Sequence, residues 1–218
     1  VYVRRVNVAG NTRTRDEVIR REMRQMESSW YDGAKINKSR TRIDRLGFFD
    51  EVTMETPAVP GTTDQVDVNV GVKERPTGNL MLGAGFSSTD KVVLSGSIQQ
   101  QNLFGSGKFL GLGLNTSKSN RVYSISYTDP YYTVDGISRG FDIYHKNLNT
   151  DSLASLATYG ARSTGAGLRY GVPVSEDDQI NFGLSIDRTV LDVTSSSPQR
   201  YLDYVEEYGN TTRTLLAT

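Results

Sequence analysis

The chain has 218 residues, no cysteine, and 25 basic against 25 acidic residues. The even charge excludes a strong overall field for nucleic acid, and the missing thiols exclude disulfides and thiolate metal sites. No apolar run approaches the roughly 20 residues of a membrane-spanning helix. Charge and glycine nevertheless divide the chain: residues 1–76 hold 26 charged residues and 5 glycines, and residues 77–218 hold 24 and 16. This shift predicts a domain boundary near residue 76.

Two helices are predicted in the first part. Thr14 followed by Glu17 is the pattern of a capping box, which predicts a helix over 15–26. A second helix is predicted to begin near Asn37 and to stop at Gly47, because glycine commonly ends helices.

Three strands complete this part, over 1–8, 51–55 and 66–72. In the last of them, four valines alternate with polar or small residues, which predicts one buried face. The order β-α-α-β-β predicts an α+β domain, in which two helices cover one face of a three-stranded sheet.

After residue 77 the sequence alternates between apolar and polar residues with a period of two. Charges such as Asp142, Arg169 and Asp187 fall in the middle of the polar faces, where a wet lumen tolerates them and a dry core does not. The pattern predicts antiparallel strands of a transmembrane β-barrel. A soluble β-sandwich is disfavoured, because its apolar faces would need a second sheet. The apolar sets of the seven segments are Leu80/Leu82/Ala84/Phe86, Val92/Leu94/Ile98, Leu110/Leu112/Leu114, Tyr123/Ile125/Tyr127, Phe141/Ile143, Ala166/Leu168/Tyr170/Val172 and Ile180/Phe182/Leu184/Ile186.

The stretch from Asp192 onward shows no further alternating segment. It is predicted to be an extracellular loop that contains a short helix over 198–208. Seven strands that end in a loop cannot close a barrel, because every strand edge in lipid must be paired.

Four motifs in the first part occur in a characteristic order and spacing. They are Arg-Glu-Met-Arg-Gln-Met-Glu at 21–27 followed by Trp30, Arg-Leu-Gly-Phe-Phe at 45–49, Val-Pro-Gly at 59–61, and Asp-Gln-Val-Asp-Val at 64–68. On these residues the chain resembles the Omp85 family. The resemblance identifies 1–76 as the last POTRA domain of a series and 77–218 as the N-terminal portion of an outer-membrane β-barrel.

The resemblance also carries expectations of architecture and function. It implies an incomplete barrel, with about seven of about sixteen strands, in the outer membrane of a Gram-negative cell with the POTRA domain in the periplasm. It implies the central subunit of the machinery that folds and inserts β-barrel proteins. The implied partners are the lipoproteins of that machinery (BamD-like and others), unfolded outer-membrane protein clients and outer-membrane lipid.

Three groups of site residues follow from the resemblance and the residues together. The resemblance places a contact with a partner lipoprotein on Glu27, with Arg24 and Glu22 beside it. The hinge between the two parts is Arg75, Pro76, Thr77 and Gly78. The first strand is expected to be a lateral gate that pairs with a client strand; its residues are Asn79, Leu80, Met81, Leu82, Gly83, Ala84, Gly85 and Phe86.

The expectation of a gate depends on weak side-chain packing on the inner face of this first strand. Gly83 and Gly85 add little side-chain packing, so the strand would hold its neighbour weakly and expose a pairing edge. The alternative is that these glycines only let a barrel wall bend. Composition alone does not separate the two interpretations.

No enzyme is expected, and no cofactor or metal. The single histidine, His145, has no sequence pattern of a nucleophile, base and oxyanion site around it. Two other functions stay open: another Omp85-type transporter (TamA-like or two-partner secretion), and a passive porin-like channel. A soluble periplasmic scaffold is the third alternative, in which residues 77–218 would need no detergent.

Overall fold

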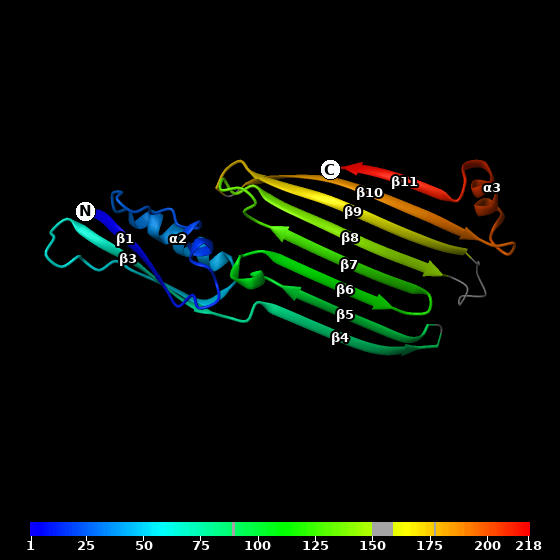
Figure 1. Ribbon diagram of the computed structural model, residues 1–218, viewed down its shortest axis with the longest axis horizontal. Helices are drawn as coiled ribbons and strands as arrows, with labels where there is room; N and C mark the ends of the chain where they lie inside the picture. Colours follow the sequence, from blue (N-terminus) through cyan, green and yellow to red (C-terminus); the bar gives the residue numbers. More distant parts are fainter. Residues whose placement is uncertain (89, 150–158, 177) are drawn as a thin grey trace. The chain divides into compact units, whose positions relative to one another are not determined.

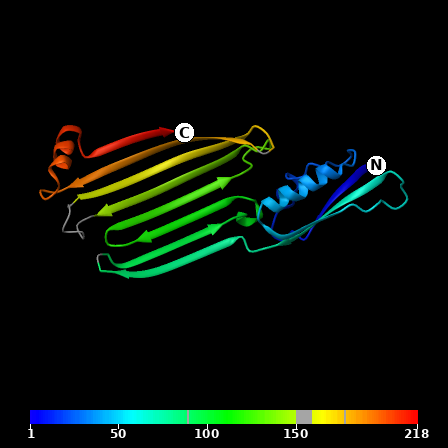
Figure 2. The same cartoon turned by 180° about the vertical axis from the view of Figure 1, so that it is seen from behind.

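The computed structural model describes residues 1–88, 90–149, 159–176 and 178–218. The chain forms two compact units, one of residues 1–77 with 101–107, and one of residues 78–100 with 108–218. Figures 1 and 2 show helices and a small sheet in the first unit and one broad sheet in the second. Residues 101–107 belong to the first unit although they follow two strands of the second, so the chain passes between the units three times.

The first unit has the predicted order β-α-α-β-β. Its elements are β1 (Tyr2–Ala9), α1 (Asp16–Arg20), α2 (Gly33–Arg45), β2 (Phe49–Glu55) and β3 (Gln65–Glu74). The strand order is β1-β3-β2, in which β1 and β3 run parallel and β2 and β3 antiparallel. Apolar side chains of both helices and all three strands form the core: Val3, Val6, Val18, Ile19, Met23, Ile36, Ile43, Phe48, Phe49, Val52, Val68, Val70 and Val72.

The first helix is much shorter than the predicted 15–26, and the predicted capping box is wrong. Arg15 is the N-cap of α1 and makes no side-chain cap, whereas Thr14 is buried. After α1, the side-chain amide of the fully buried Gln25 forms hydrogen bonds with backbone groups of the non-helical segment that follows. Its Nε2 donates to the Trp30 carbonyl at 2.9 Å, and its Oε1 accepts from the Asp32 amide at 3.0 Å. A buried amide satisfied in this way holds a compact non-helical segment.

The second helix begins four residues before the predicted Asn37. Its N-cap is Asp32, whose carboxylate accepts from the amide of Ala34 at 2.8 Å and so satisfies one of the free N–H groups of the first turn. The helix ends at Arg45, and Gly47 follows with a φ of +71°, which glycine adopts at low cost. Among the residues that the structure describes, no helix is long and apolar enough to cross a membrane.

The second unit is an antiparallel sheet in which each strand pairs with the next along the chain. Its strands are β4 (Gly78–Ser87), β5 (Lys91–Gln100), β6 (Phe109–Thr116), β7 (Asn120–Asp129), β8 (Ser138–Asn149), β9 (Tyr159–Pro173), β10 (Gln179–Val193) and β11 (Thr211–Ala217). The expected short helix is present as α3 (Gln199–Tyr208). The expectation of seven strands and a final loop is wrong, because β11 follows α3 and pairs with β10. The sheet has eight strands and is open, as an incomplete barrel requires.

The register of the strands sorts side chains onto two different faces. One row across all eight strands consists of apolar residues: Leu80, Ile98, Leu112, Ile125, Ile143, Ala166, Ile186 and Leu215. The adjacent row, on the other face, is small or polar except for Met81 at its β4 end: Met81, Ser97, Gly113, Ser124, Tyr144, Gly165, Asp187 and Thr214. An apolar band on one face and a polar lining on the other is the pattern of an outer-membrane barrel wall.

Candidate functional site

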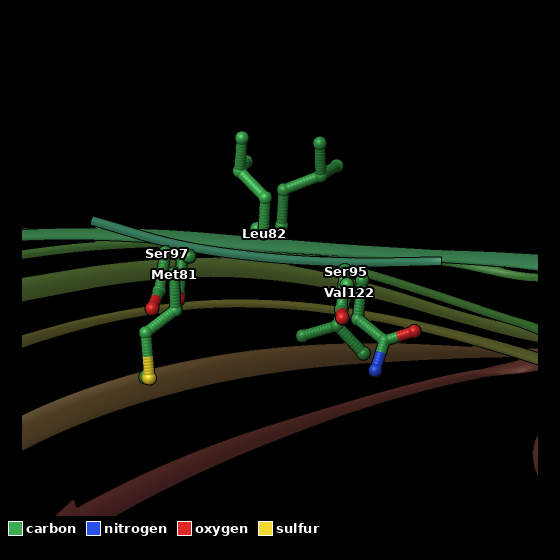
Figure 3. A pocket seen from close by; sticks show the side chains of 11 residues that line it. Met81, Leu82, Ser95, Ser97 and Val122 are labelled. Carbon is green, nitrogen blue, oxygen red and sulfur yellow. The ribbon is translucent and has the colours of Figure 1, made fainter. Parts of the chain in front are cut away.

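All eight predicted gate residues lie in one strand at the edge of the sheet. In the described chain, β4 has a single strand neighbour, β5, so its other edge has no strand partner. Leu82 and Phe86 are 79% and 77% exposed. Figure 3 shows Leu82 on one side of the sheet and Met81, Ser95 and Ser97 on the other. The strand therefore has an apolar face and a lumen-type face, and it is the first strand of the sheet.

The inner face next to this edge is hollow. A shallow groove of about 410 Å³ lies over β4 to β7, and its lining residues are Met81, Leu82, Gly83, Ser95, Gly96, Ser97, Gly113, Leu114, Asn115, Val122 and Ser124. Gly83 faces Ser95 so closely that a Cβ at position 83 would lie 2.5 Å from the serine Oγ. Within positions 79–86 and 92–99, all of them described, no side-chain hydrogen bond joins β4 to β5. Backbone pairing and apolar contacts on the outer face remain to hold the two strands together.

The inner face of the later strands is built differently. Asp142 accepts from Arg169 Nε at 2.6 Å across β8 and β9, and the Tyr144 hydroxyl donates to Asp187 across two strands. Gly165 lies under the Tyr144 ring, since a Cβ there would come within 2.5 Å of it. Side-chain hydrogen bonds thus connect β8, β9 and β10, whereas on this face β4 and β5 meet at Gly83 and Ser95 without such a bond.

The three predicted partner-contact residues differ in how far they are exposed to solvent. Glu27 is about half exposed, and its Oε1 accepts from the Val6 amide at 2.8 Å. Arg24 is half-buried, and its amide donates to Ser39 Oγ at 2.8 Å. Glu22 is only 4% exposed, and its carboxylate is 2.8 Å from the guanidinium of Arg42. The Glu22 carboxylate is therefore buried inside the unit, whereas the Glu27 carboxylate is accessible to a partner.

The hinge is held by its own unit. The Arg75 amide donates to the Phe48 carbonyl at 3.1 Å, and its Nε donates to the Gly47 carbonyl at 2.7 Å. The Thr77 carbonyl accepts from the Gln101 amide at 3.0 Å, which joins the hinge to the segment that follows β5. In the structure, residues 75–77 are therefore fixed by hydrogen bonds at several points.

Just before the hinge, Glu74 binds the loop that leads to α1. Its carboxylate accepts from the amides of Thr14 at 2.6 Å and Arg13 at 3.0 Å, and from Thr12 Oγ1 at 2.8 Å. Burial alone would raise the pKa of Glu74, but the hydrogen bonds from Thr14, Thr12 and Arg13 outweigh it and hold the pKa below its ordinary value. The end of β3 and the start of α1 are thereby tied together.

A set of residues that the sequence interpretation missed lies in 101–107. Asn102 is 8% exposed, and its Nδ2 donates to Thr14 Oγ1 at 2.8 Å. The Gly105 carbonyl accepts from the Arg15 amide at 2.9 Å. The signal in the sequence was Asn-Leu-Phe-Gly-Ser-Gly at 102–107, where asparagine and two glycines allow left-handed backbone.

His145 lies on the exposed surface of the sheet, next to a threonine of the neighbouring strand. It is exposed on β8, and its Nδ1 is 2.8 Å from Thr164 Oγ1 on β9. In the described ranges, no three histidine or acidic side chains are gathered as a metal site would need.

Comparison with known proteins gives the family. The POTRA family (surface antigen variable number repeat) matches residues 1–75, and the Omp85 superfamily domain matches residues 102–218. The outer membrane protein assembly factor BamA of Neisseria meningitidis is 42% identical over 97% of this chain and 27% of its own length. BamA of Nitratidesulfovibrio vulgaris is 34% identical over 88% of this chain and 23% of its own length. The chain thus spans about a quarter of these relatives.

A solved structure agrees over the whole chain. The crystal structure of BamA from Haemophilus ducreyi lacking POTRA domains 1–3 superposes with a TM-score of 0.73 at 32% identity, and it covers 100% of this chain and 42% of that one. These matches place the chain in the outer membrane, with its POTRA domain in the periplasm. With a POTRA domain followed by strands of a β-barrel, the chain belongs to the Omp85 superfamily.

Proposed function

We propose that this chain is part of a BamA-type assembly factor, which folds and inserts β-barrel proteins into the outer membrane. Relatives that match nearly all of the chain are named outer membrane protein assembly factors, which supports this role. The mechanism rests on one observation: β4, the first strand of the sheet, has Gly83 and Gly85 on its inner face, and no side-chain hydrogen bond joins it to β5 within positions 79–86 and 92–99. The factor acts by strand pairing and uses no covalent chemistry.

Strand pairing at this edge suits many clients. An unsatisfied backbone group in lipid costs several kcal/mol. Pairing with any strand that supplies N–H and C=O groups therefore lowers the free energy of this edge. Main-chain pairing depends little on the client's side chains, and an exposed edge is a ready template for it. The C-terminal strand of the client pairs with β4, the client grows strand by strand, and it is released when its own edges close.

Cysteine pairs test the gate. Cysteines at Asn79 or Met81 are expected to form disulfides with cysteines in the final strand of a client during assembly, in a pattern that follows one register. The control is Ser97→Cys, since Ser97 lies opposite Met81 on β5, one strand further from the edge. Equal cross-linking at both strands, or none at any β4 position, would refute strand pairing at β4. A passive channel would show a large constant conductance and no client disulfide.

We also propose that Glu27 contacts a basic group of a partner lipoprotein of the machinery, with Arg24 beside it. Glu22, whose carboxylate faces Arg42, takes part by holding the segment in place. Next to Glu27, Met26 and Trp30 are 59% and 65% exposed and add apolar area to the same segment. A charge-assisted hydrogen bond with an apolar surround is a common form of contact.

The test must separate the charge of Glu27 from its bond to the Val6 amide. Glu27→Gln keeps an acceptor for that amide and removes the charge, and Glu27→Lys reverses it. Both are expected to reduce co-purification of the lipoprotein, Lys more than Gln, with unchanged circular dichroism. Normal co-purification of both variants would remove Glu27 from the contact.

A further inference from the structure

The turn between β5 and β6 is built into the POTRA unit. Asn102 is the central residue, because its side chain bonds in two directions. Its Nδ2 donates to Thr14 Oγ1 at 2.8 Å, and its Oδ1 accepts from the Gly107 amide at 2.7 Å. The Gly105 carbonyl adds a backbone bond from Arg15. Thr14 and Asn102 are both nearly inaccessible to water, so leaving either side chain without its partner is costly.

The backbone of this turn fits the POTRA surface closely. Asn102, Phe104, Gly105 and Gly107 all have φ between +50° and +73°. A Cβ at position 105 would lie 1.9 Å from the Arg13 carbonyl oxygen, a contact that real side chains do not make. Only glycine therefore allows this turn to seat against residues 13–15.

The surface that receives the turn is itself anchored. Glu74, the last residue of β3, holds the amides of Arg13 and Thr14. The Gln101 amide donates to the Thr77 carbonyl, which joins the start of the turn to the hinge. The POTRA unit thus holds the chain immediately before β4, immediately after β5 and immediately before β6.

We propose that Asn102 and Gly105 are positioning residues, through which the POTRA unit anchors the chain between the end of β5 and the start of β6. This rests on the proposed function. The contacts of residues 75–77 alone would fix only the chain before β4, whereas the contacts of 101–107 also fix the chain that follows β5. With the chain anchored on both sides of it, the β4–β5 hairpin keeps its own pairing while client strands add at the other edge of β4.

The test uses glycine substitutions in the complete protein, reconstituted in lipid vesicles. Gly105→Ala cannot seat the turn, and amide hydrogen exchange is expected to rise about tenfold both in 101–107 and in 11–16, a factor that corresponds to about 1.4 kcal/mol. The control is Gly61→Ala, since Gly61 has a similar φ of +82° with no atom within 4 Å of its Cβ site. The control is expected to leave exchange in both segments unchanged. Exchange that rises in 101–107 alone would overturn the docking.

Assembly of a client barrel is then measured on the same vesicles. Gly105→Ala is expected to slow assembly severalfold and Gly61→Ala to leave it unchanged; normal assembly with lost protection overturns the positioning role. If Gly105→Ala does not fold, Asn102→Ala replaces it, with the exposed Asn37→Ala as its control and the same expectations. A wild-type protein that assembles no client removes the proposed function, and the exchange pattern alone then decides the docking.

Discussion

Replacement of Glu22 separates a structural role from a binding role. The Glu22 carboxylate is 2.8 Å from Arg42 and 3.9 Å from Arg21, with side-chain exposures of 5%, 18% and 19%. Glu22→Gln removes the negative charge that faces two largely buried guanidinium groups. Removal of one partner from such a buried pair costs about 3–5 kcal/mol. A domain of this size has a total stability of roughly 4–12 kcal/mol, so a large share of it is lost.

The assay is urea unfolding of the POTRA domain in the complete protein, followed by hydrogen exchange of the core amides. Glu17→Gln is the control, because the Arg15–Glu17 pair is 59% and 68% exposed at 3.5 Å. An exposed pair contributes about 0–1 kcal/mol. If Glu22→Gln unfolds like Glu17→Gln yet loses the partner lipoprotein, the carboxylate binds the partner and the structural reasoning is wrong.

Three further perturbations act on single contacts. Because hydrogen bonds lower the pKa of Glu74, its contribution to stability is present above the ordinary value of about 4.3 and is lost as the pH falls through the lowered pKa; Glu74→Gln is expected to flatten the acid side of a stability–pH curve. Gly165→Val pushes the Tyr144 ring away, and the folded band in unheated gels is expected to be lost at a lower temperature, for a cost of about 1–3 kcal/mol. Asp90→Asn is expected to speed hydrogen exchange in 117–120, because the Asp90 carboxylate accepts three hydrogen bonds from that turn.

Each of these has a result that would count against it. If the stability–pH curve of Glu74→Gln is as steep on the acid side as that of the wild type, other carboxylates cause the loss of stability in acid. Gly85→Val is the control for the barrel, since its Cβ site has no atom within 4 Å, and equal losses for both glycine variants would deny a specific clash at 165. Unchanged exchange in 117–120 would show that the backbone alone holds that turn.

The sequence predicted what depends on periodicity. Alternation at period two placed seven of the eight strands, because apolar side chains on the outer face alternate with mostly polar or small residues on the inner one. It missed β11, in which Leu215 and Leu216 are adjacent and so fall on opposite faces. The strand is held by its register with β10, which no local pattern reveals.

Contacts between distant residues account for the other differences. The helix predicted over 15–26 stops at Arg20, since the side chain of Gln25 satisfies backbone groups that a helix would otherwise use. Thr14 matched a capping pattern, but its hydroxyl bonds to Asn102, 88 residues away. Burial of Glu22 depends on Arg42 of α2. Local propensity carries no information on such partners.

The parallel pairing of β1 with β3 has a consequence for the order in which the chain folds. β1 is made first but cannot complete its pairing with β3 until Gly71 has emerged, and the loop that follows β1 lacks Asn102 until later still. At ordinary rates of synthesis the interval between these residues is on the order of a few seconds. During that time two apolar membrane strands have already left the ribosome. The nascent chain therefore exposes membrane strands, and needs protection from aggregation, before the POTRA unit can be complete.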